Sequence, residues 1–265
     1  GTAFPRRSDR SQSMNCYVGI DIGAVSATAA LLVQDGVYDQ AVALKLIHDN
    51  DPVRVDRFGA DAVRYYFMKE IEFGRDGDYN ETRFVNIVNA DLANDLGNLL
   101  NRTLKMAHKY CGGVVPEISA EDLGDDCPPK VLGTELPETV KSAYNTLEFH
   151  QAGDAILELV RSCNKYLDDR APWTLYKHGE QAAVEAVLYI VLESVRLAAY
   201  LLSPIVPQLS STIYQQLGFE TDFDRIDLIP ETASFEVHGR WGMLPSGQQT
   251  NRPSPVFQRI ELEVN

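Results

Sequence analysis

The chain has 265 residues, of which 45% are hydrophobic and 23% charged, and this composition is typical of a globular protein. Its formal net charge of −14 argues against loose, salt-driven binding to nucleic acid, because such binding requires a surplus of Lys and Arg. The charge leaves open a local RNA site that relies on stacking and on hydrogen bonds to unpaired bases.

The longest apolar segment, 182–202, contains Glu185, Glu193 and Arg196. A membrane span needs ~20 predominantly apolar residues, so we interpret this segment as a buried amphipathic helix. The four cysteines include no CxxC pair, and we therefore expect no metal site built from cysteine.

Residues 1–50 differ in pattern from the rest of the chain. The first 15 residues carry three Arg and several Ser, and we interpret them as a disordered tail, with a transit peptide as the alternative. Extended segments are predicted at 17–22 and 29–33, and a strand or short helix at 37–46. This short β-type segment is too small to bury a core alone.

From residue 51 onward, apolar residues recur at helical spacing, and Pro and Gly separate the segments. The predicted helices are 51–67, 81–111, 138–149, 152–168, 180–202 and 207–217, with a loop at 114–136 and a strand at 254–264. Short links between them predict a mainly α protein, an antiparallel helix bundle.

Four polar residues, Asn94, Asn98, Asn101 and Arg102, lie on the longest predicted helix. Asn98 and Arg102 are four apart and share a face that is turned away from the leucines of the same helix. Amides can pair with base edges, and a guanidinium can stack on a base or hold a phosphate. A solvated helix face is the plainer interpretation of the same spacing.

The segment NKYLDDRAPW, 164–173, ends a predicted helix, and Pro172 places Trp173 at the end of the bundle. An aromatic ring there can stack on an unpaired base. The alternative is a tryptophan that fills the gap between two helices.

Several segments together resemble the methionyl-tRNA synthetases, a family of class I aminoacyl-tRNA synthetases. They are DPVRVDRFGADAVRYY (51–66), FGRDGDYNETRFVNIVNADLANDLGNLLNRTL (73–104), NKYLDDRAPW (164–173) and SPVFQRIE (254–261). The resemblance covers about residues 50–262. It implies four parts: a segment unrelated to the family at 1–50, a connector similar to the one that contacts the tRNA stem at 51–79, an anticodon-binding helix bundle at 80–240 and a tail at 241–265.

The resemblance also implies roles for individual residues. In the family the anticodon CAU is read by an Asn and an Arg one turn apart and by a Trp that follows Ala-Pro; these positions are Asn98, Arg102 and Trp173, with Pro172 beside them. The implied partner is the anticodon loop of tRNA(Met), with no DNA and no membrane. Trp173 would stack on the first anticodon base.

The catalytic motifs of the family are absent from these 265 residues. None of the five histidines lies in an HIGH-like context, and no KMSKS-like loop precedes residue 51. We therefore expect no catalytic residue and no cofactor in this chain, although the full family enzyme uses ATP and Mg. A separate catalytic chain is one possibility, and both cytoplasm and an organelle (mitochondrion or plastid) remain open.

The segment YVGIDIGAVSATAALL, 17–32, resembles the first phosphate-binding hairpin of actin-like ATPases and sugar kinases. Asp21 and Gly23 match the residues that approach phosphate and metal there, so we expect a vestigial phosphate hairpin. Three hypotheses result: a module that binds the methionine anticodon, a truncated structural relic without RNA binding, and a sugar-kinase-like ATP-binding fragment.

The absence of catalytic motifs gives a first prediction. The chain by itself should form no methionyl-adenylate, because no residue in it matches those that bind ATP in the family. ATP–pyrophosphate exchange in the presence of methionine should stay at background, and exchange well above background would contradict the prediction.

Overall fold

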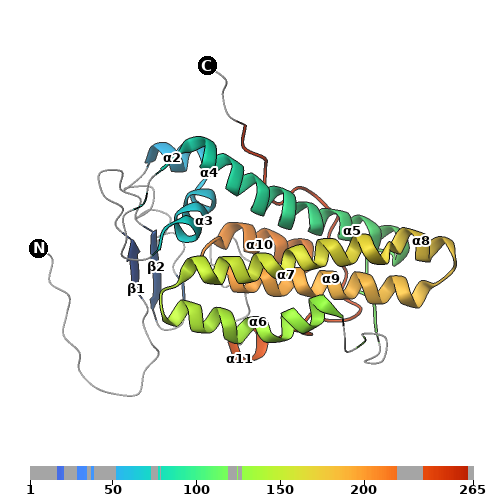
Figure 1. Ribbon diagram of the computed structural model, residues 1–265. Helices are drawn as coiled ribbons and strands as arrows, with labels where there is room; N and C mark the ends of the chain where they lie inside the picture. The colour runs from blue at the N-terminus through green and yellow to red at the C-terminus, as the bar shows by residue number, and fades with distance from the viewer. Residues whose placement is uncertain are drawn as a thin grey trace, which may run out of the picture.

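The computed structural model describes residues 17–20, 29–34, 37–38, 52–72, 77, 79–118, 124, 127–219 and 235–261. Figure 1 shows long helices that run nearly side by side, with α8 at one end of the bundle and the short strands at the other. This arrangement confirms the prediction of a mainly α protein built as a helix bundle.

Helices make up most of the described part of the chain after residue 51. They are α2 (Pro52–Phe58), α3 (Ala60–Glu70), α4 (Glu81–Val88), the π-helical η1 (Asn89–Gly97), α5 (Asn98–Tyr110), α6 (Pro128–Asn145), α7 (Phe149–Arg170), α8 (Pro172–Lys177), α9 (Gln181–Leu202), α10 (Pro207–Gln216) and α11 (Phe235–His238).

Three short strands precede the helices: β1 (Tyr17–Ile20), β2 (Ala29–Gln34) and β3 (Val37–Tyr38). They form an antiparallel sheet in the order β1-β2-β3, in which Tyr17 is opposite Leu32. Asp21 and Gly23, the residues assigned to a phosphate hairpin, lie outside the described residues.

Elements α4, η1 and α5 form one continuous helix from residue 81 to residue 110, as the sequence predicted. The side chain of Asn80 caps its start by accepting a hydrogen bond of 2.9 Å from the N–H of Arg83. The sequence did not indicate the π-helical stretch, where the N–H of Asn98 bonds to the carbonyl of Ala93, five residues back.

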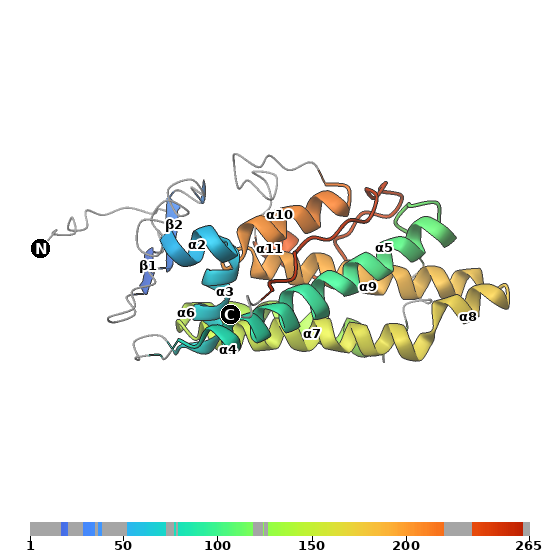
Figure 2. The same cartoon turned by 90° about the horizontal axis from the view of Figure 1, so that it is seen from above.

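Helix α9 lies at the centre of the bundle and contacts α5, α6, α7, α8 and α10 (Figure 2). Every residue from 186 to 202 is buried, so most of this helix has no solvent face. The prediction of an amphipathic helix is therefore wrong in one respect: Glu193 and Arg196 do not mark a polar surface.

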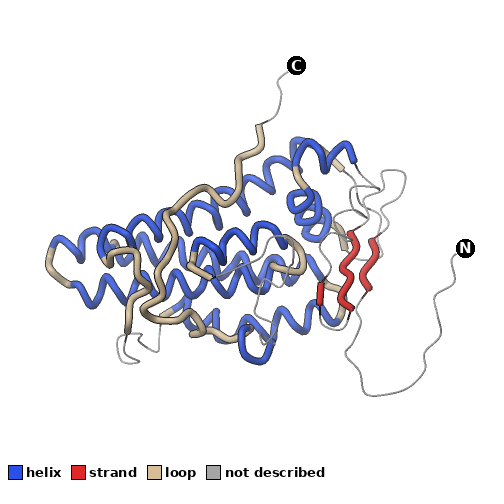
Figure 3. The backbone as a smooth tube through the Cα atoms, turned by 180° about the vertical axis from the view of Figure 1, so that it is seen from behind, coloured by secondary structure: helices blue, strands red, loops and turns tan. Residues whose placement is uncertain are grey.

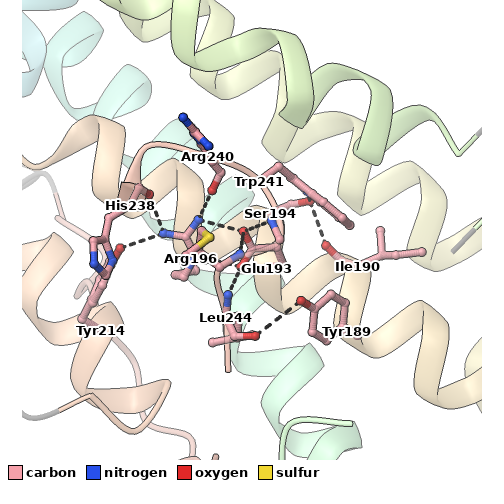
Figure 4. A network of polar contacts seen from close by, with 12 residues as sticks. Tyr189, Ile190, Glu193, Ser194, Arg196, Tyr214, His238, Arg240, Trp241 and Leu244 are labelled. Carbon is pink, nitrogen blue, oxygen red and sulfur yellow. Dashed lines mark hydrogen bonds and ion pairs between the residues drawn. The ribbon is translucent and has the colours of Figure 1, made fainter. Parts of the chain in front are cut away.

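Glu193 and Arg196 instead form a buried ion pair (Figure 4), with side chains 0% and 1% exposed. The guanidinium of Arg196 donates to both carboxylate oxygens at 2.7 Å and to the carbonyls of His238 and Arg240. Glu193 accepts the N–H groups of the turn at 242–244. A buried pair is tolerated when its remaining hydrogen-bonding capacity is filled in this way, and here it attaches the turn to the core.

Helix α6 corrects the predicted loop at 114–136, because it begins at Pro128, ten residues before the predicted start at 138. Pro128 and Pro129 occupy the first helical turn, where a missing N–H costs nothing. Gly133 lies inside the helix, and a Cβ there would come within 2.2 Å of the Trp241 indole. The two prolines that suggested a loop thus begin the helix, and Gly133 leaves room for the Trp241 ring.

The C-terminal segment crosses the back of the bundle and then follows the long helix (Figure 3). Asn89 exchanges two hydrogen bonds of 2.8 Å with the backbone N–H and C=O of Ile260, and Val256 packs near Gly97. The predicted strand at 254–264 is wrong over 254–261, because these backbone groups pair with a side chain and not with another strand.

The buried carboxyl of Asp61 gives a prediction for the fold. It accepts a hydrogen bond of 2.7 Å from the N–H of Leu209 in the first turn of α10. Burial raises its pKa from 3.8 to about 6, while the Leu209 N–H and the charge of Arg64 act in the opposite direction. A raised pKa means that Asp61 stabilises the fold at low pH, and this stability is lost as the pH rises from 3.8 through about 6.

The difference between the ordinary pKa of 3.8 and the pKa of about 6 for Asp61 corresponds to about 3 kcal/mol in the free energy of unfolding. Asp61→Asn removes the titrating group. Between pH 3.8 and about 6, the free energy of unfolding of this variant should therefore change by about 3 kcal/mol less than that of the wild type. Denaturant unfolding at a series of pH values measures the difference. Equal pH dependence in the two proteins would show that Asp61 titrates normally.

Candidate nucleic-acid interface

The candidate residues Asn98 and Arg102 lie on one face of α5. Asn98 is exposed, and the side chain of Arg102 is 40% exposed, whereas Leu96 and Leu99 are fully buried. The structure thus places the amide and the guanidinium on the same outward face, as their spacing predicted. The leucines on the opposite side of the helix anchor it in the core.

Helix α7 is joined to this long helix by a row of polar contacts. Arg161 donates to Asp91 and Asp95 at 2.8 and 2.9 Å, and the amide of Asn164 donates to the carbonyl of Asp95. Further along, Arg102 donates to Asp168 at 2.6 Å. Since 161, 164 and 168 share one face of α7, these contacts fix the register of the two helices.

Asp91 is the most buried member of this row, at 3% exposure. Besides Arg161, it accepts hydrogen bonds from the hydroxyl of Tyr65 at 2.8 Å and the ammonium of Lys69 at 2.7 Å. Burial, and then the nearby Asp91 carboxylate, raise the pKa of Tyr65, so its hydroxyl remains a donor. One carboxylate therefore ties α3, η1 and α7 together.

Helix α7 passes into α8 through a sharp turn at Ala171, which has φ 44° and ψ 63°. This left-handed conformation is unusual for a residue with a Cβ, and it ends α7. Pro172 then begins α8 and is buried, while Trp173 is 36% exposed. The predicted end of this helix at 168 is two residues early, because α7 ends at Arg170, and Pro172 then occupies the first position of α8.

The pair between Arg102 and Asp168 joins the predicted residue Arg102 to the last turn of α7. Asp168 is the fifth residue before Trp173, so the contact joins the outward face of α5 to the chain that leads into α8. Asn98 lies one turn before Arg102, and buried Pro172 supports the start of α8. Sequence reasoning missed Asp168, although it lies inside the NKYLDDRAPW motif.

A sequence profile described as the anticodon binding domain of methionyl tRNA ligase matches residues 130–264, which is half of the chain. The chain belongs to the methionyl-tRNA synthetase family. A second profile, described as tRNA synthetases class I (M), matches residues 46–104 and includes Asn98 and Arg102. The chain is thus the anticodon-binding region of a methionine–tRNA ligase.

Individual relatives agree with this assignment. The chain is 53% identical over 236 residues to the methionine–tRNA ligase of Nostoc sp., and the match spans 88% of this chain and 43% of that protein. It is 44% identical over 210 residues to the chloroplastic/mitochondrial methionine–tRNA ligase of Arabidopsis thaliana, across 78% and 33% of the two chains. This chain therefore spans less than half the length of these relatives.

Solved structures show the same fold. The apo form of Mycobacterium tuberculosis methionyl-tRNA synthetase superimposes with a TM-score of 0.70 at 32% identity, over 81% of this chain and 42% of that one. The same enzyme in complex with methionyl-adenylate gives a TM-score of 0.68 at 33% identity, over 80% and 40%. The helical arrangement of this synthetase chain is thus that of the C-terminal part of the family.

Neither profile extends to residues 17–32, so these matches give no support to the resemblance of that segment to actin-like ATPases. Within the described ranges, no group of His, Cys, Asp and Glu side chains is arranged to hold a metal ion. None of the helices that the structure describes has both the length and the apolar character of a membrane span.

The geometry predicts that Arg102 is dispensable for folding of the synthetase chain. Its pair with Asp168 is exposed, with side chains 40% and 60% accessible, and such pairs contribute about 1 kcal/mol or less. Arg102→Ala should therefore lower the free energy of unfolding by no more than that. Asp91→Ala should cost about 3 kcal/mol, because it leaves buried donors without an acceptor.

Denaturant unfolding of both variants, with the slope of the transition checked against the wild type, measures this contrast. A loss of several kcal/mol in Arg102→Ala would show that the residue is structural and not reserved for a ligand.

Proposed function

We propose that this chain binds the anticodon loop of tRNA(Met) through the surface formed by Asn98, Arg102 and Trp173. The observation that carries the proposal is the contact between Arg102 and Asp168 at 2.6 Å. It connects the outward face of α5 to the segment that positions the exposed Trp173. An amide, a guanidinium and an indole on adjoining elements suit unpaired bases, which are read by stacking and by hydrogen bonds to their edges.

Trp173 is the stacking residue in this proposal. Its indole is 36% exposed on a short helix whose first residue, Pro172, is buried and whose approach is fixed by the turn at Ala171. The ring is therefore held outward before the RNA arrives, which lowers the entropy cost of binding. It stacks on the first anticodon base, and Pro172 beside it belongs to the same anticodon-binding surface.

Asn98 and Arg102 contact base edges and backbone. Arg102 uses one Nη2 hydrogen bond to Asp168 and has other N–H groups to offer, because a guanidinium carries five donors. Asp168 holds this side chain in a defined orientation. Asn98, one turn earlier and exposed, supplies both a donor and an acceptor, as discrimination between bases requires.

The activity of the whole family enzyme is also part of the proposal. We infer that the chain serves methionyl-tRNA aminoacylation, together with a catalytic part that uses ATP and Mg and that either precedes it or comes as a separate chain. The match to an Arabidopsis enzyme described as chloroplastic/mitochondrial, and to a cyanobacterial one, supports action in the cytoplasm or an organelle.

Comparison of two tRNAs tests the proposal. Filter binding of tRNA(Met) and of the same tRNA with a changed anticodon should show at least tenfold weaker binding of the changed one, which is about 1.4 kcal/mol. Trp173→Ala should weaken binding of the unchanged tRNA by a similar or larger factor, since stacking on an aromatic ring contributes about 1–3 kcal/mol per base.

Val131→Ala is the matched control, because Val131 is also an exposed apolar residue, at 43%, and lies on α6. It should bind both tRNAs as the wild type does. Equal binding of the two tRNAs, or no binding, would favour the alternative, a structural relic of the family. Unfolding of the Trp173→Ala variant would show that the indole fills a gap in the bundle.

A further inference from the structure

A pair of stacked tyrosines lies beside the surface just described. The rings of Tyr110 and Tyr176 have centroids 4.3 Å apart and an interplanar angle of 27°. Tyr110 is the last residue of α5 and is half-buried, whereas Tyr176 belongs to α8 and is 45% exposed. One ring thus supports the other, and the outer ring keeps accessible area.

The outer ring lies close to Trp173. The two residues are three apart on α8 and so are neighbours on the helix surface. Tyr110 follows Arg102 by eight residues on α5, which corresponds to about 12 Å along the helix axis. The pair is therefore further along the same end of the bundle, within reach of a second nucleotide of the same loop.

The support beneath the outer ring is fixed in place. The side-chain amide of Gln181, at the start of α9, donates to the carbonyl of Tyr110 at 3.2 Å and to the carboxylate of Glu185 at 2.8 Å. The end of α5 is thereby held against α9. Tyr176 stacks on a ring whose backbone cannot move freely.

The charges around the pair favour a nucleic-acid ligand. The ammonium of Lys109 lies 5.2 Å from the centroid of the Tyr110 ring, and Lys177 is exposed next to Tyr176. His178 faces Glu180 at 3.7 Å, and Glu185 accepts from the Gln181 amide that holds Tyr110, so two acidic groups are close as well. In a chain with a formal net charge of −14, two lysines beside exposed aromatic rings suit a phosphate backbone that approaches here.

The exposed apolar surface at this corner is confined to two side chains of α8. Of the large hydrophobic residues exposed in the described part of the chain, two, Trp173 and Tyr176, share the six-residue α8. The residues that follow on this corner, 177–180, are exposed and polar. A stable protein interface would need a much wider patch.

We propose that Tyr176, supported by Tyr110, is a second stacking platform that binds an unpaired purine of the tRNA loop outside the three anticodon positions. The proposal rests on the proposed function, because it requires that the loop binds at Trp173. A purine is the expected occupant since its two rings cover more of the exposed tyrosine face than a pyrimidine would.

An abasic scan of the anticodon stem-loop RNA tests the platform with the full chain. Each loop purine outside the anticodon is replaced in turn by an abasic nucleotide, and binding is measured to the wild type, Tyr176→Ala and Tyr176→Phe. One abasic position should weaken wild-type binding about tenfold. Tyr176→Ala should bind the unmodified RNA about tenfold more weakly and should be insensitive to that same abasic replacement, whereas Tyr176→Phe should behave as the wild type.

The outcomes separate the two proposals. In one outcome the wild type binds the RNA, Trp173→Ala does not, and Tyr176→Ala binds normally or stays sensitive at every abasic position. The stacking platform is then wrong, and the anticodon site stands. If the wild type binds no RNA, both fail. Loss of binding in Tyr176→Phe as well as in Tyr176→Ala would assign the residue to a hydrogen bond and overturn stacking.

Discussion

The row of polar contacts between α7 and the long helix is the constraint on which the proposed surface depends. Hydrophobic packing alone would leave two long helices free to slide, since leucines at helical spacing can pack in more than one register. Arg161 donates hydrogen bonds to Asp91 and Asp95, and Arg102 donates a hydrogen bond to Asp168 further along the two helices. Because Asp91, the first acceptor of this row, is buried, the register of the exposed last contact is set from the edge of the core.

The rest of the bundle is held together by contacts that lie away from the proposed binding surface. Helix α9 occupies the centre, and its buried pair of Glu193 and Arg196 holds the turn at 242–244 and the carbonyls of 238 and 240. The C-terminal segment then runs along η1, where Asn89 fixes it at Ile260. The backbone of this long segment is thus satisfied away from α8, whose aromatic side chains remain outward.

Much of the fold was predictable because local patterns and the final packing agree. The leucines of the long helix recur at helical spacing and are all buried, so both its length and its outward face followed from the sequence. The same spacing put Asn98 and Arg102 on one face. Their role in binding stays a prediction, as does that of Trp173, because no contact within the chain reports on an RNA ligand.

Other features depended on distant residues and could not be predicted. Gly133 and the two prolines at the start of α6 indicate a loop locally, and only the packing of Trp241 against Gly133 explains a helix there. The contact of the Asn89 amide could not be predicted either, because its partner lies 171 residues away. Asp168 was inside the NKYLDDRAPW segment and Tyr176 came just after it, but their partners, Arg102 and Tyr110, lie on another helix.

The central claim is that these side chains read the anticodon itself. A double-mutant cycle tests it most directly by combining Trp173→Ala with an abasic replacement of the first anticodon base, and by measuring dissociation constants for all four combinations of protein and tRNA. The account predicts that the base replacement weakens binding about tenfold in the wild type and hardly at all in the variant, a coupling of about 1.4 kcal/mol. Additive effects, with the same loss in both proteins, would contradict it.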